Sequence, residues 1–346
     1  MEQKKQSFDG GLTENILLTD YDSDFIQEKG FDEWTSYRKN WQKYCDLEEE
    51  SSYPIHLEIE LNYSCNLKCP FCTWSAESTV EKRSEWFTFE DYKKIIDEAV
   101  KKGTKSVRLC YINEPLIRPD LDQFIKYSSD AGILDVIITT NGTLMTKAVS
   151  KKLIESGLTK LNVSLDAATK ETYDKVRIGG EFEKTVKNIH DFLDIRKDLG
   201  KKLPKIRLSF VISKINQHEY NEFVKYWENK VDSLGIQHVQ NPFGEGKFED
   251  KTRGNHFMIE NKNSKPSKFH CSEPFKRLTL RSNGDVLPCC SFYAVDMIVG
   301  NWKNTSLEEI WNSQKMRELR EIHKKGEYYE NRVCKNCVEN FSYIAD

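Results

Sequence analysis

The chain has 346 residues, of which 38% are hydrophobic and 31% are charged. This balance is typical of a soluble globular enzyme and excludes a disordered chain, and the length suits one large α/β domain with a smaller unit. The formal net charge of −3 leaves no basic excess to neutralise a nucleic-acid backbone. The N-terminus lacks the apolar run of a signal peptide, and no stretch approaches the ~20 apolar residues of a membrane span. We therefore expect a cytoplasmic protein that binds neither nucleic acid nor membrane.

The first elements in chain order are a polar segment, a strand and a helix. Residues 1–52 are polar with scattered aromatic side chains, and we predict a helical extension there. The stretch "IHLEIEL", from Ile55, alternates apolar and polar residues as a strand does. After a cysteine-containing loop, "TFEDYKKIIDEAVKKG" carries apolar residues at helical spacing, with Thr88 as the N-cap and Gly103 as the end of the helix.

Strands and helices then alternate along the chain. The expected strands cover residues 106–112, 135–140, 160–166, 206–213 and 236–240, and the expected helices cover residues 121–131, 147–155, 182–199 and 219–229. Six strands joined by helices predict an α/β fold of parallel βα units over residues 53–245. Such units form either an open doubly wound sheet or a partial barrel.

From about Phe257 the pattern changes, which predicts a small C-terminal domain over residues 257–346. The stretch "RLTLRSNGDVLPCC" is typical of a hairpin, in which Asn283 and Gly284 would take the positive φ angles of a tight turn. The stretch "SLEEIWNSQKMRELREIH" predicts one helix that begins with a capping box of Ser306 and Glu309.

The ten cysteines fall mainly into two groups. In a reducing cytosol they are not a disulfide framework, and their grouping indicates metal ligation. Cys45 and Cys110 stand alone and are expected to be ordinary apolar side chains. The first group is Cys65, Cys69 and Cys72, and the second is Cys271, Cys289, Cys290, Cys334 and Cys337.

The first group has an unusual number of ligands. Three thiolates on one loop can bind three irons of a four-iron cluster and leave the fourth iron open to a substrate or cofactor. The alternative is zinc with a fourth ligand from elsewhere, although the usual zinc pattern consists of two close pairs of ligands.

The spacing of Cys65, Cys69 and Cys72 after the first strand, with Phe71 before the third cysteine, resembles the radical S-adenosylmethionine (SAM) superfamily. The resemblance implies a partial (β/α)6 barrel of the TIM type. It also implies that the open iron of a [4Fe–4S] cluster binds the amino and carboxylate groups of SAM. Reduction of the cluster then cleaves SAM to a 5′-deoxyadenosyl radical, which abstracts a hydrogen atom from the substrate.

Further motifs follow the next strands, where such a barrel has its active site. "YINEPL" is similar to the Gly-Gly-Glu-Pro element of the family, with Ile112 and Asn113 in place of the two glycines. Glu114 is then implied to pair with the SAM ammonium group, and an arginine in "KVRIGG" to pair with the SAM carboxylate. The implied SAM contacts are Phe71, Asn113, Glu114, Asn141, Ser164, Asp166 and Arg177.

Taken alone, several of these residues have an ordinary structural interpretation. Asn141 can belong to a turn, Asp166 can cap a helix, and Arg177 can be a solvated surface charge. Only their order and spacing along the predicted barrel favour the SAM site.

The second cysteine group has enough thiols to close another cluster. "NGDVLPCC" and "CKNC" resemble the SPASM and twitch extensions of radical SAM enzymes, and five cysteines suffice for one auxiliary [4Fe–4S] cluster. The implied ligands are Cys271, Cys289, Cys334 and Cys337. Adjacent cysteines rarely bind one cluster together, and the spacing favours Cys289 over Cys290 as the ligand. The alternative role for such a centre is stabilisation of a small domain.

The spacing is most similar to that of 2-deoxy-scyllo-inosamine dehydrogenases, which oxidise a secondary alcohol of an aminocyclitol. The resemblance covers residues 53–340 and implies a radical SAM oxidoreductase that acts on a small carbohydrate or aminocyclitol-like molecule. Loss of a hydrogen atom from a carbinol carbon leaves a radical that must lose a proton and one more electron to become a ketone. An auxiliary cluster with four protein ligands suits acceptance of that electron, and a flavodoxin or ferredoxin is the implied electron donor.

Other functions stay open at this point. Epimerisation is a related radical reaction, and many SPASM relatives modify a peptide or protein. Peptide-modifying relatives often carry an N-terminal peptide-binding domain, for which about fifty residues are too few. An iron–sulfur electron carrier or structural protein would not explain the cysteine triplet together with Glu114. The sequence identifies no catalytic base.

Overall fold

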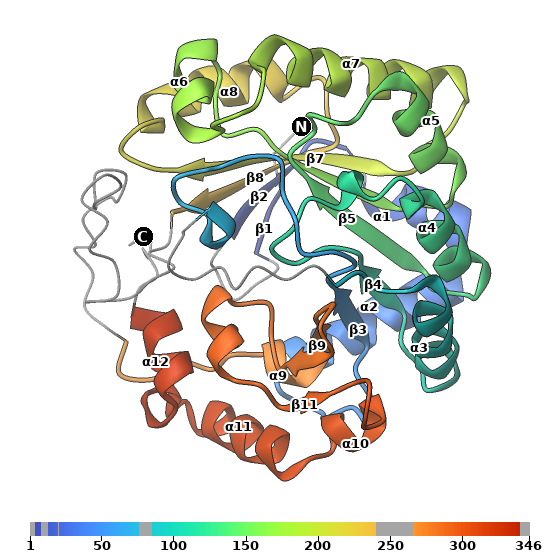
Figure 1. Ribbon diagram of the computed structural model, residues 1–346, viewed down its shortest axis with the longest axis vertical. Helices are drawn as coiled ribbons and strands as arrows, with labels where there is room; N and C mark the ends of the chain where they lie inside the picture. Colours follow the sequence, from blue (N-terminus) through green and yellow to red (C-terminus); the bar gives the residue numbers. More distant parts are fainter. Residues whose placement is uncertain (1–3, 8–12, 20, 76–84, 240–265, 340–346) are drawn as a thin grey trace.

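The computed structural model describes residues 4–7, 13–19, 21–75, 85–239 and 266–339. Its centre is a curved sheet, with helices along the outer side and a C-terminal unit next to one edge (Figure 1). None of the helices in these ranges combines the length and the apolar character that crossing a membrane requires.

Six parallel strands form the central part of the sheet, and they pair in sequence order. The two outer strands of this set pair with further strands instead of with each other, so the barrel is open and the expected partial (β/α)6 barrel is confirmed. The strands are β3 (His56–Ile59), β4 (Ser106–Arg108), β5 (Asp135–Thr140), β6 (Lys160–Ser164), β7 (Lys205–Ile212) and β8 (Ser233–His238).

Both edges of the barrel sheet are covered by added strands. At one edge, β2 (Thr13–Leu17) pairs antiparallel with β8 and with β1 (Lys4–Ser7). At the other edge, β9 (Arg277–Leu280) pairs parallel with β3, followed by β10 (Asp285–Leu287) and β11 (Gly300–Asn301). The N-terminal segment was predicted to be helical, but it also contributes the strands β1 and β2. The C-terminal unit shares one sheet with the barrel.

Helices cover the outer side of the sheet. Five of them lie close to the predicted ranges: α3 (Phe89–Lys101), α4 (Leu121–Asp130), α5 (Lys147–Glu155), α7 (Phe182–Asp198) and α8 (Tyr220–Trp227). The Thr88 hydroxyl accepts a hydrogen bond from the Asp91 amide as the predicted N-cap. The sequence did not predict α6 (Lys170–Val176), because seven residues are too few to establish a helical period.

Two strands differ from their predicted ranges by three or more residues at one end. β4 ends at Arg108, four residues before the predicted end, because the chain turns there toward the "YINEPL" loop. β8 begins at Ser233, three residues before the predicted start. Gly235 obscures the alternation there, and it is needed because a Cβ atom at this position would lie 2.0 Å from the Arg207 guanidinium.

The strands have one apolar face and one polar face. On β7, Ile206, Leu208 and Phe210 are fully buried in the core beneath the helices, while the residues between them point to the opposite side. The same alternation puts polar residues on the inner face of several strands, including Glu58 on β3, Asn162 on β6 and Ser209 on β7. The inside of the open barrel is thus lined largely by polar side chains.

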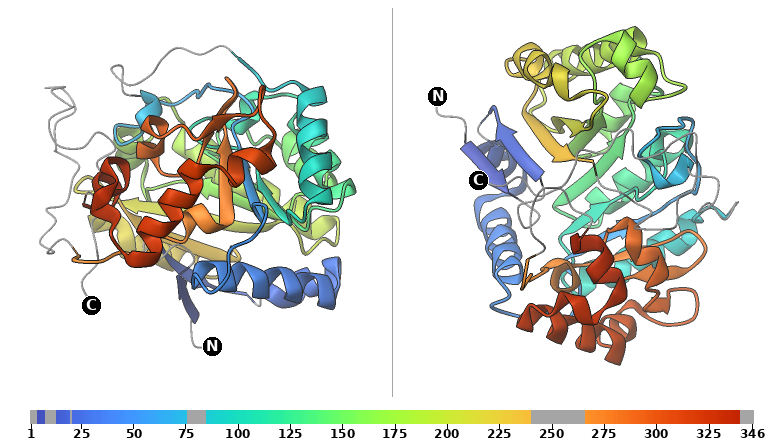
Figure 2. Two further views of the ribbon diagram at one scale, coloured as in Figure 1. Left: turned by 90° about the horizontal axis from the view of Figure 1, so that it is seen from below. Right: turned by 90° about the vertical axis from the view of Figure 1, so that its left-hand side faces the viewer.

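The N-terminal helices α1 (Tyr21–Lys29) and α2 (Phe31–Cys45) close the amino-terminal end of the barrel. Phe25, Trp34 and Tyr37 are buried in a separate apolar cluster with residues that precede β3, β5 and β7. Lys160 pairs with the buried Asp135 at 2.6 Å beneath this cluster. Figure 2 shows that α2 runs on toward the C-terminal unit, where it contacts α9 (Glu273–Lys276).

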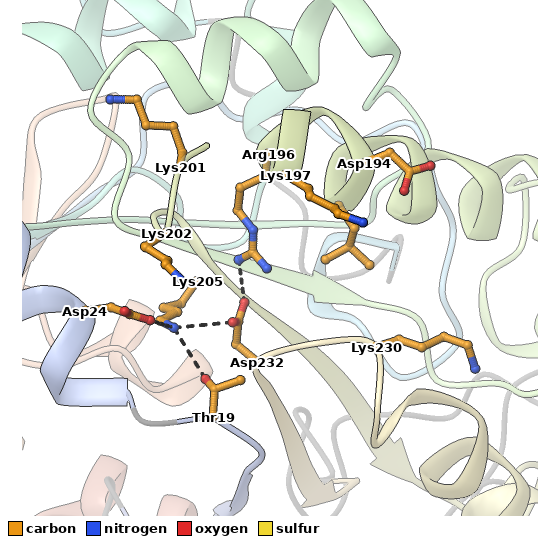
Figure 3. Close-up of a pocket in the computed structure, with 11 residues that line it drawn as sticks. Thr19, Asp24, Asp194, Arg196, Lys197, Lys201, Lys202, Lys205, Lys230 and Asp232 are labelled. Carbon is orange, nitrogen blue, oxygen red and sulfur yellow. Dashed lines mark hydrogen bonds and ion pairs between the residues drawn. The ribbon is translucent and has the colours of Figure 1, made fainter. Parts of the chain in front are cut away.

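A groove of about 470 Å³ lies at the same amino-terminal end of the strands (Figure 3). Its buried centre is Lys205, which pairs with Asp24 of α1 and with Asp232 before β8. Arg196 also pairs with Asp232. Because the cysteine loop follows the carboxyl end of β3, this groove lies at the opposite end of the barrel from that loop. Its charges fasten the N-terminal segment to the barrel.

The hairpin of β9 and β10 is confirmed, but its turn is not the predicted one. Gly284 has a φ of 105°, whereas Asn283 is absent from the described residues with positive φ. Arg281 and Asp285 close a three-residue loop, and the Gly284 amide donates to the Arg281 carbonyl at 3.0 Å. This is a type I turn followed by glycine, in which the Asn283 side chain accepts from the Asp285 amide.

The predicted helix of residues 306–323 is two helices, α10 (Leu307–Trp311) and α11 (Gln314–Lys325). The capping box of Ser306 and Glu309 is present as predicted. The break arises because Ser313 acts as a second N-cap, accepting from the Met316 amide. The last helix is α12 (Arg332–Glu339), and the predicted boundary between the two domains lies outside the described residues.

Candidate active site

The cysteine triplet lies on the loop that follows the carboxyl end of β3. The Cys72 amide donates to the Cys69 carbonyl at 3.1 Å, and the Ser75 amide donates to the Cys72 carbonyl at 3.1 Å. These turns bring three free thiols together on one short segment. The Glu114 amide donates to the Ser64 carbonyl at 2.8 Å and so joins the loop after β4 to the cysteine loop.

Two polar side chains from other strand ends point at sulfur atoms of the triplet. Arg177 Nη1 lies 3.6 Å from Cys69 Sγ, and Asn141 Nδ2 lies 3.9 Å from Cys65 Sγ. Burial raises the pKa of the Cys65 thiol to about 12 and that of Cys72 to about 11. The thiols are therefore neutral near pH 7 and need a metal to become thiolates.

Glu114 is a buried carboxylate at the end of β4, next to the triplet. It accepts hydrogen bonds from the Thr140 hydroxyl at 2.6 Å and from the Asn141 amide at 2.7 Å. Burial raises the pKa of this carboxyl, and the hydrogen bonds oppose that rise. Glu114 thus connects the loop after β4 with the end of β5.

Asp166 and Arg177 form a buried ion pair. Asp166 has a φ of 59°, a conformation that is uncommon for a residue other than glycine and that is often found at functional sites. Its other oxygen accepts from the Val211 amide at 2.8 Å. Arg177 also faces the ring of Phe71, with the guanidinium carbon 5.7 Å from the centroid, so it is not a solvated surface charge.

Arg177 Nε is buried and makes no hydrogen bond within the described part of the chain. A buried donor of this kind calls for an acceptor beyond the described residues. Arg177 therefore has a protein partner that the sequence did not predict, Asp166, and still has a donor free for an anionic ligand group.

The last two predicted SAM contacts differ in character. Asn113 accepts from the Tyr111 amide and donates to Asn62, both at 2.9 Å. Its side chain thus holds the loop that glycines form in the family. Ser164 lies half-buried at the end of β6, on the inner face of the barrel.

The triplet fits a cluster better than it fits a single metal ion. No three His, Cys, Asp or Glu side chains in the described ranges converge as one metal ion would require. The ligands of a four-iron cluster each bind a different iron, so they have no need to converge in this way. Three thiols near a buried arginine with a free donor suit a cluster whose open iron holds an amino acid.

The second cysteine group is assembled from separate segments. Cys271 precedes α9, Cys289 follows β10, and Cys334 and Cys337 lie on α12. All are free thiols. The pKa of Cys289 is raised by burial, then by the adjacent Cys290, and then by Cys271, Cys337 and Cys334.

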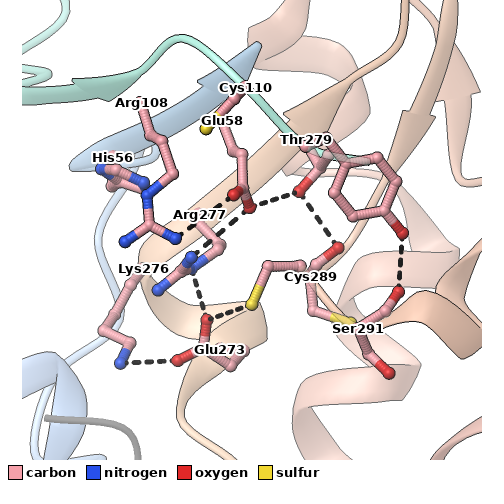
Figure 4. A network of polar contacts seen from close by, with 12 residues as sticks. His56, Glu58, Arg108, Cys110, Glu273, Lys276, Arg277, Thr279, Cys289 and Ser291 are labelled. Carbon is pink, nitrogen blue, oxygen red and sulfur yellow. Dashed lines mark hydrogen bonds and ion pairs between the residues drawn. The ribbon is translucent and has the colours of Figure 1, made fainter. Parts of the chain in front are cut away.

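Cys290 faces a different set of groups, and the four charged residues among them are labelled in Figure 4. Its Sγ lies 3.7 Å from a carboxylate oxygen of Glu273. The charged groups that act on it are Arg277, Glu273, Glu58 and Arg108, and no other cysteine is among its main influences. Cys290 thus has Glu273 beside its sulfur, and the choice of Cys289 as the cluster ligand stays a prediction.

A buried charged network lies beside the second cysteine group (Figure 4), and the sequence did not predict it. Glu58 on β3 lies 3.4 Å from Arg108 on β4 and 3.5 Å from Arg277 on β9. Glu273 pairs with Arg277 and with Lys276. Polar or charged residues at every second position of "HLEIEL" and of "RLTLR" indicate that each strand has one polar face. Only the pairing of β3 with β9 brings the two polar faces together.

Comparisons with known proteins agree with these two sites. The model of the radical SAM superfamily matches residues 59–226, and the model of the SPASM iron–sulfur cluster-binding domain matches residues 271–338. The two matched ranges contain the cysteine triplet and the second cysteine group, respectively. Radical SAM domains bind a [4Fe–4S] cluster and SAM, and SPASM domains bind auxiliary iron–sulfur clusters.

The similar proteins have several activities. An AdoMet-dependent heme synthase of Methanosarcina barkeri is 29% identical over 82% of this chain and 91% of its own length. A probable GTP 3′,8-cyclase of Saccharolobus solfataricus is 30% identical, but over 56% of this chain and 60% of its own length.

Two solved structures share the fold. Streptococcus suis SuiB bound to S-adenosylmethionine has a TM-score of 0.62 and 20% identity, covering 89% of this chain and 78% of that one. BtrN in complex with AdoMet and 2-DOIA has a TM-score of 0.53 and 18% identity, covering 83% of this chain and 93% of that one. The chain thus contains a radical SAM domain that is followed by a C-terminal SPASM-type iron–sulfur domain.

Proposed function

We propose that this enzyme abstracts a hydrogen atom from a small carbohydrate or aminocyclitol-like molecule and oxidises an alcohol to a ketone. The observation that carries the proposal is the polar inner face of the open barrel. Thr139, Asn162 and Ser164 lie on the inner face of β5 and β6, and Asn162 donates to the Thr139 hydroxyl at 3.3 Å. Hydroxyl and amide groups match the hydrogen-bonding pattern of a polyol.

The proposed site holds its cofactors through residues of the chain. Cys65, Cys69 and Cys72 would bind the first [4Fe–4S] cluster, and the free donor of Arg177 would bind the SAM carboxylate. Glu114 would face the SAM ammonium group, and Phe71, Asn113, Asn141, Ser164 and Asp166 would line the rest of the SAM site. When bound, these groups supply a 5′-deoxyadenosyl radical that abstracts hydrogen.

The second cysteine group would supply a place for the second electron of the oxidation. Cys271, Cys289, Cys334 and Cys337 would fill all four ligand positions of an auxiliary [4Fe–4S] cluster. The charged network of Glu58, Arg108 and Arg277 lies beside this group, and Glu58 belongs to the inner face of the barrel. A substrate on that face would then lie between the two clusters. A flavodoxin or ferredoxin is the proposed electron donor.

A second candidate is a radical reaction on a peptide. SuiB has also been crystallised with its precursor peptide SuiA, and that structure has a TM-score of 0.59 with this chain. Against this candidate, the described residues before β3 extend and close the barrel sheet through β1, β2, α1 and α2, and they form no separate peptide-binding unit.

Transfer of deuterium tests the proposed reaction. Reconstituted enzyme, SAM and a reductant would be incubated with aminocyclitols and sugars that carry deuterium at the carbinol carbons, with a peptide arm and a GTP arm alongside. The proposal predicts deuterium in 5′-deoxyadenosine and about one ketone for each SAM consumed. Deuterium transfer in the peptide or GTP arm alone would contradict the proposed substrate class.

A further inference from the structure

Two side chains that are not cysteines contact sulfur atoms of expected cluster ligands in the second cysteine group. The Ser291 hydroxyl donates to Cys337 Sγ at 3.3 Å, and His323 Nε2 lies 3.3 Å from Cys334 Sγ. Ser291 follows β10 and His323 lies on α11, so the two contacts come from different elements. Neither residue belongs to the cysteine motifs, and the sequence analysis did not single out either one.

The hydrogen-bonding partners of His323 fix its tautomer. Its Nδ1 accepts a hydrogen bond from the Cys271 amide at 3.3 Å, so Nδ1 carries no proton. Because Nδ1 carries no proton, the imidazole ring is neutral. A neutral imidazole with an unprotonated Nδ1 carries its proton on Nε2, which makes Nε2 a donor to Cys334 Sγ. His323 thereby connects two cysteines that are 63 residues apart in the numbering.

The Ser291 hydroxyl is also fixed in direction. It accepts from the Tyr293 amide at 3.3 Å, which leaves its single proton for Cys337 Sγ. The Ser291 carbonyl accepts from the Tyr111 hydroxyl at 2.7 Å. Tyr111 belongs to the "YINEPL" loop of the barrel, and its amide donates to Asn113 at 2.9 Å. A hydrogen-bonded path thus runs from the candidate SAM site to a sulfur of the second group.

We propose that His323 and Ser291 raise the reduction potential of the auxiliary cluster by donating hydrogen bonds to Cys334 and Cys337, and that Tyr111 positions Ser291 for this role. The proposal rests on the auxiliary cluster of the proposed function. Hydrogen bonds to cluster sulfurs stabilise the reduced state, which carries one more negative charge. A cluster with a raised potential accepts the electron of a substrate more readily.

A purely structural role would give different results. Ser291 also caps the turn of residues 292–296, and its carbonyl accepts from the Ala294 amide at 3.0 Å. Loss of a structural contact would lower the stability of the protein or its iron content. Loss of a donor to sulfur would shift the potential of a cluster that is still fully assembled.

The experiment is a redox titration monitored by electron paramagnetic resonance. The full chain would carry Cys65→Ala, Cys69→Ala and Cys72→Ala, so that only the auxiliary cluster contributes to the spectrum. In this background we would compare Ser291→Ala, Ser291→Thr, His323→Phe and Tyr111→Phe. Tyr92→Phe is the matched control, because Tyr92 is a buried tyrosine whose hydroxyl contacts Ser128, on helices remote from both cysteine groups.

Each lost donor should make the cluster about tenfold harder to reduce, which equals about 59 mV for a one-electron couple. This shift is expected for Ser291→Ala and for His323→Phe, whereas Ser291→Thr keeps the hydroxyl and should stay near the parent value. Tyr111→Phe should give a smaller shift in the same direction. It should add nothing to Ser291→Ala in the double variant, because both act through one hydroxyl.

Two results would overturn the proposal. One is a potential that stays at the parent value in Ser291→Ala and His323→Phe while the iron content is retained. The other is a shift in the Tyr92→Phe control as large as that in the test variants. Failure of the proposed function is distinguishable, because the background protein would then contain no iron and no cluster signal.

Discussion

The two cysteine groups of this protein are built in opposite ways. Cys65, Cys69 and Cys72 lie within one loop, and the groups that approach their sulfurs are Arg177 and Asn141, from the ends of the barrel. The second group is collected from three separate parts of the C-terminal unit, and uncharged donors of that same unit approach its sulfurs.

This difference separates an open site from a closed one. The open site has three cysteines and a buried arginine donor with no partner in the described ranges, which leaves room for an exogenous ligand. The closed site would have four cysteine ligands, which would leave no ligand position unfilled. A local loop thus suits exchange of a cofactor, and a non-local assembly suits a permanent centre.

The largest effect is expected when the three cysteines of the open site are removed. Replacing Cys65, Cys69 and Cys72 by alanine should abolish reductive SAM cleavage, with 5′-deoxyadenosine below detection, because no iron remains for SAM to bind. About four irons should stay, all at the closed site. Mass-spectrometric quantification of 5′-deoxyadenosine and an iron assay check both points, and cleavage at the parent rate would contradict the assignment.

Replacement of one of two adjacent cysteines is expected to disrupt the closed site, whereas replacement of the other is not. Cys289→Ala should lose most of the auxiliary cluster, about four of eight irons, because Cys289 is its expected fourth ligand. Cys290→Ala is the matched control and should retain the iron, because Cys290 faces Glu273. Iron and sulfide analysis of both variants checks this expectation, and the reverse pattern would make Cys290 the ligand.

A smaller effect is expected from the arginine of the open site. Arg177→Gln should raise the Kd for SAM by about tenfold to a hundredfold, because a hydrogen bond to a charged group contributes about 1.5–3 kcal/mol. Calorimetric titration of the reconstituted protein with SAM measures this change. Arg196→Gln, which breaks an ion pair at the opposite end of the barrel, is the control, and an unchanged Kd in Arg177→Gln would contradict the role of its free donor.

The smallest expected change is the loss of a single iron from the unmutated protein on mild oxidation. Mild oxidation should remove the one iron without a cysteine ligand, so that about seven of eight irons remain. The same treatment of the triple-alanine variant should remove none. Loss of iron from that variant would mean that its cluster also has an open position.

Much of the fold and of the open site could be predicted from the sequence, because the information is local. The strand over residues 135–140 and the helix over residues 147–155 match their predicted ranges, since alternation and caps act within a few residues. The triplet lies on one loop, so its spacing was enough to indicate a cluster.

The features that were missed depend on contacts between distant segments. The pairing of β9 with β3 was not predicted from the sequence. This pairing brings Arg277 close to Glu58. Nor did it indicate that Asp166 would pair with Arg177, or that His323 would contact Cys334, because each pair meets only in the folded chain. The helix break at Ser313 was missed because the helical period on its two sides is continuous enough to suggest one helix.

The most direct test of the two-site account is electron paramagnetic resonance of the reduced protein, with and without SAM, combined with an iron count. Two four-iron clusters require about eight irons for each chain. We also expect SAM to change the spectrum of one cluster, and the triple-alanine variant to lack this cluster. A count of about four irons, or a SAM-dependent change that persists in the variant, would contradict the account.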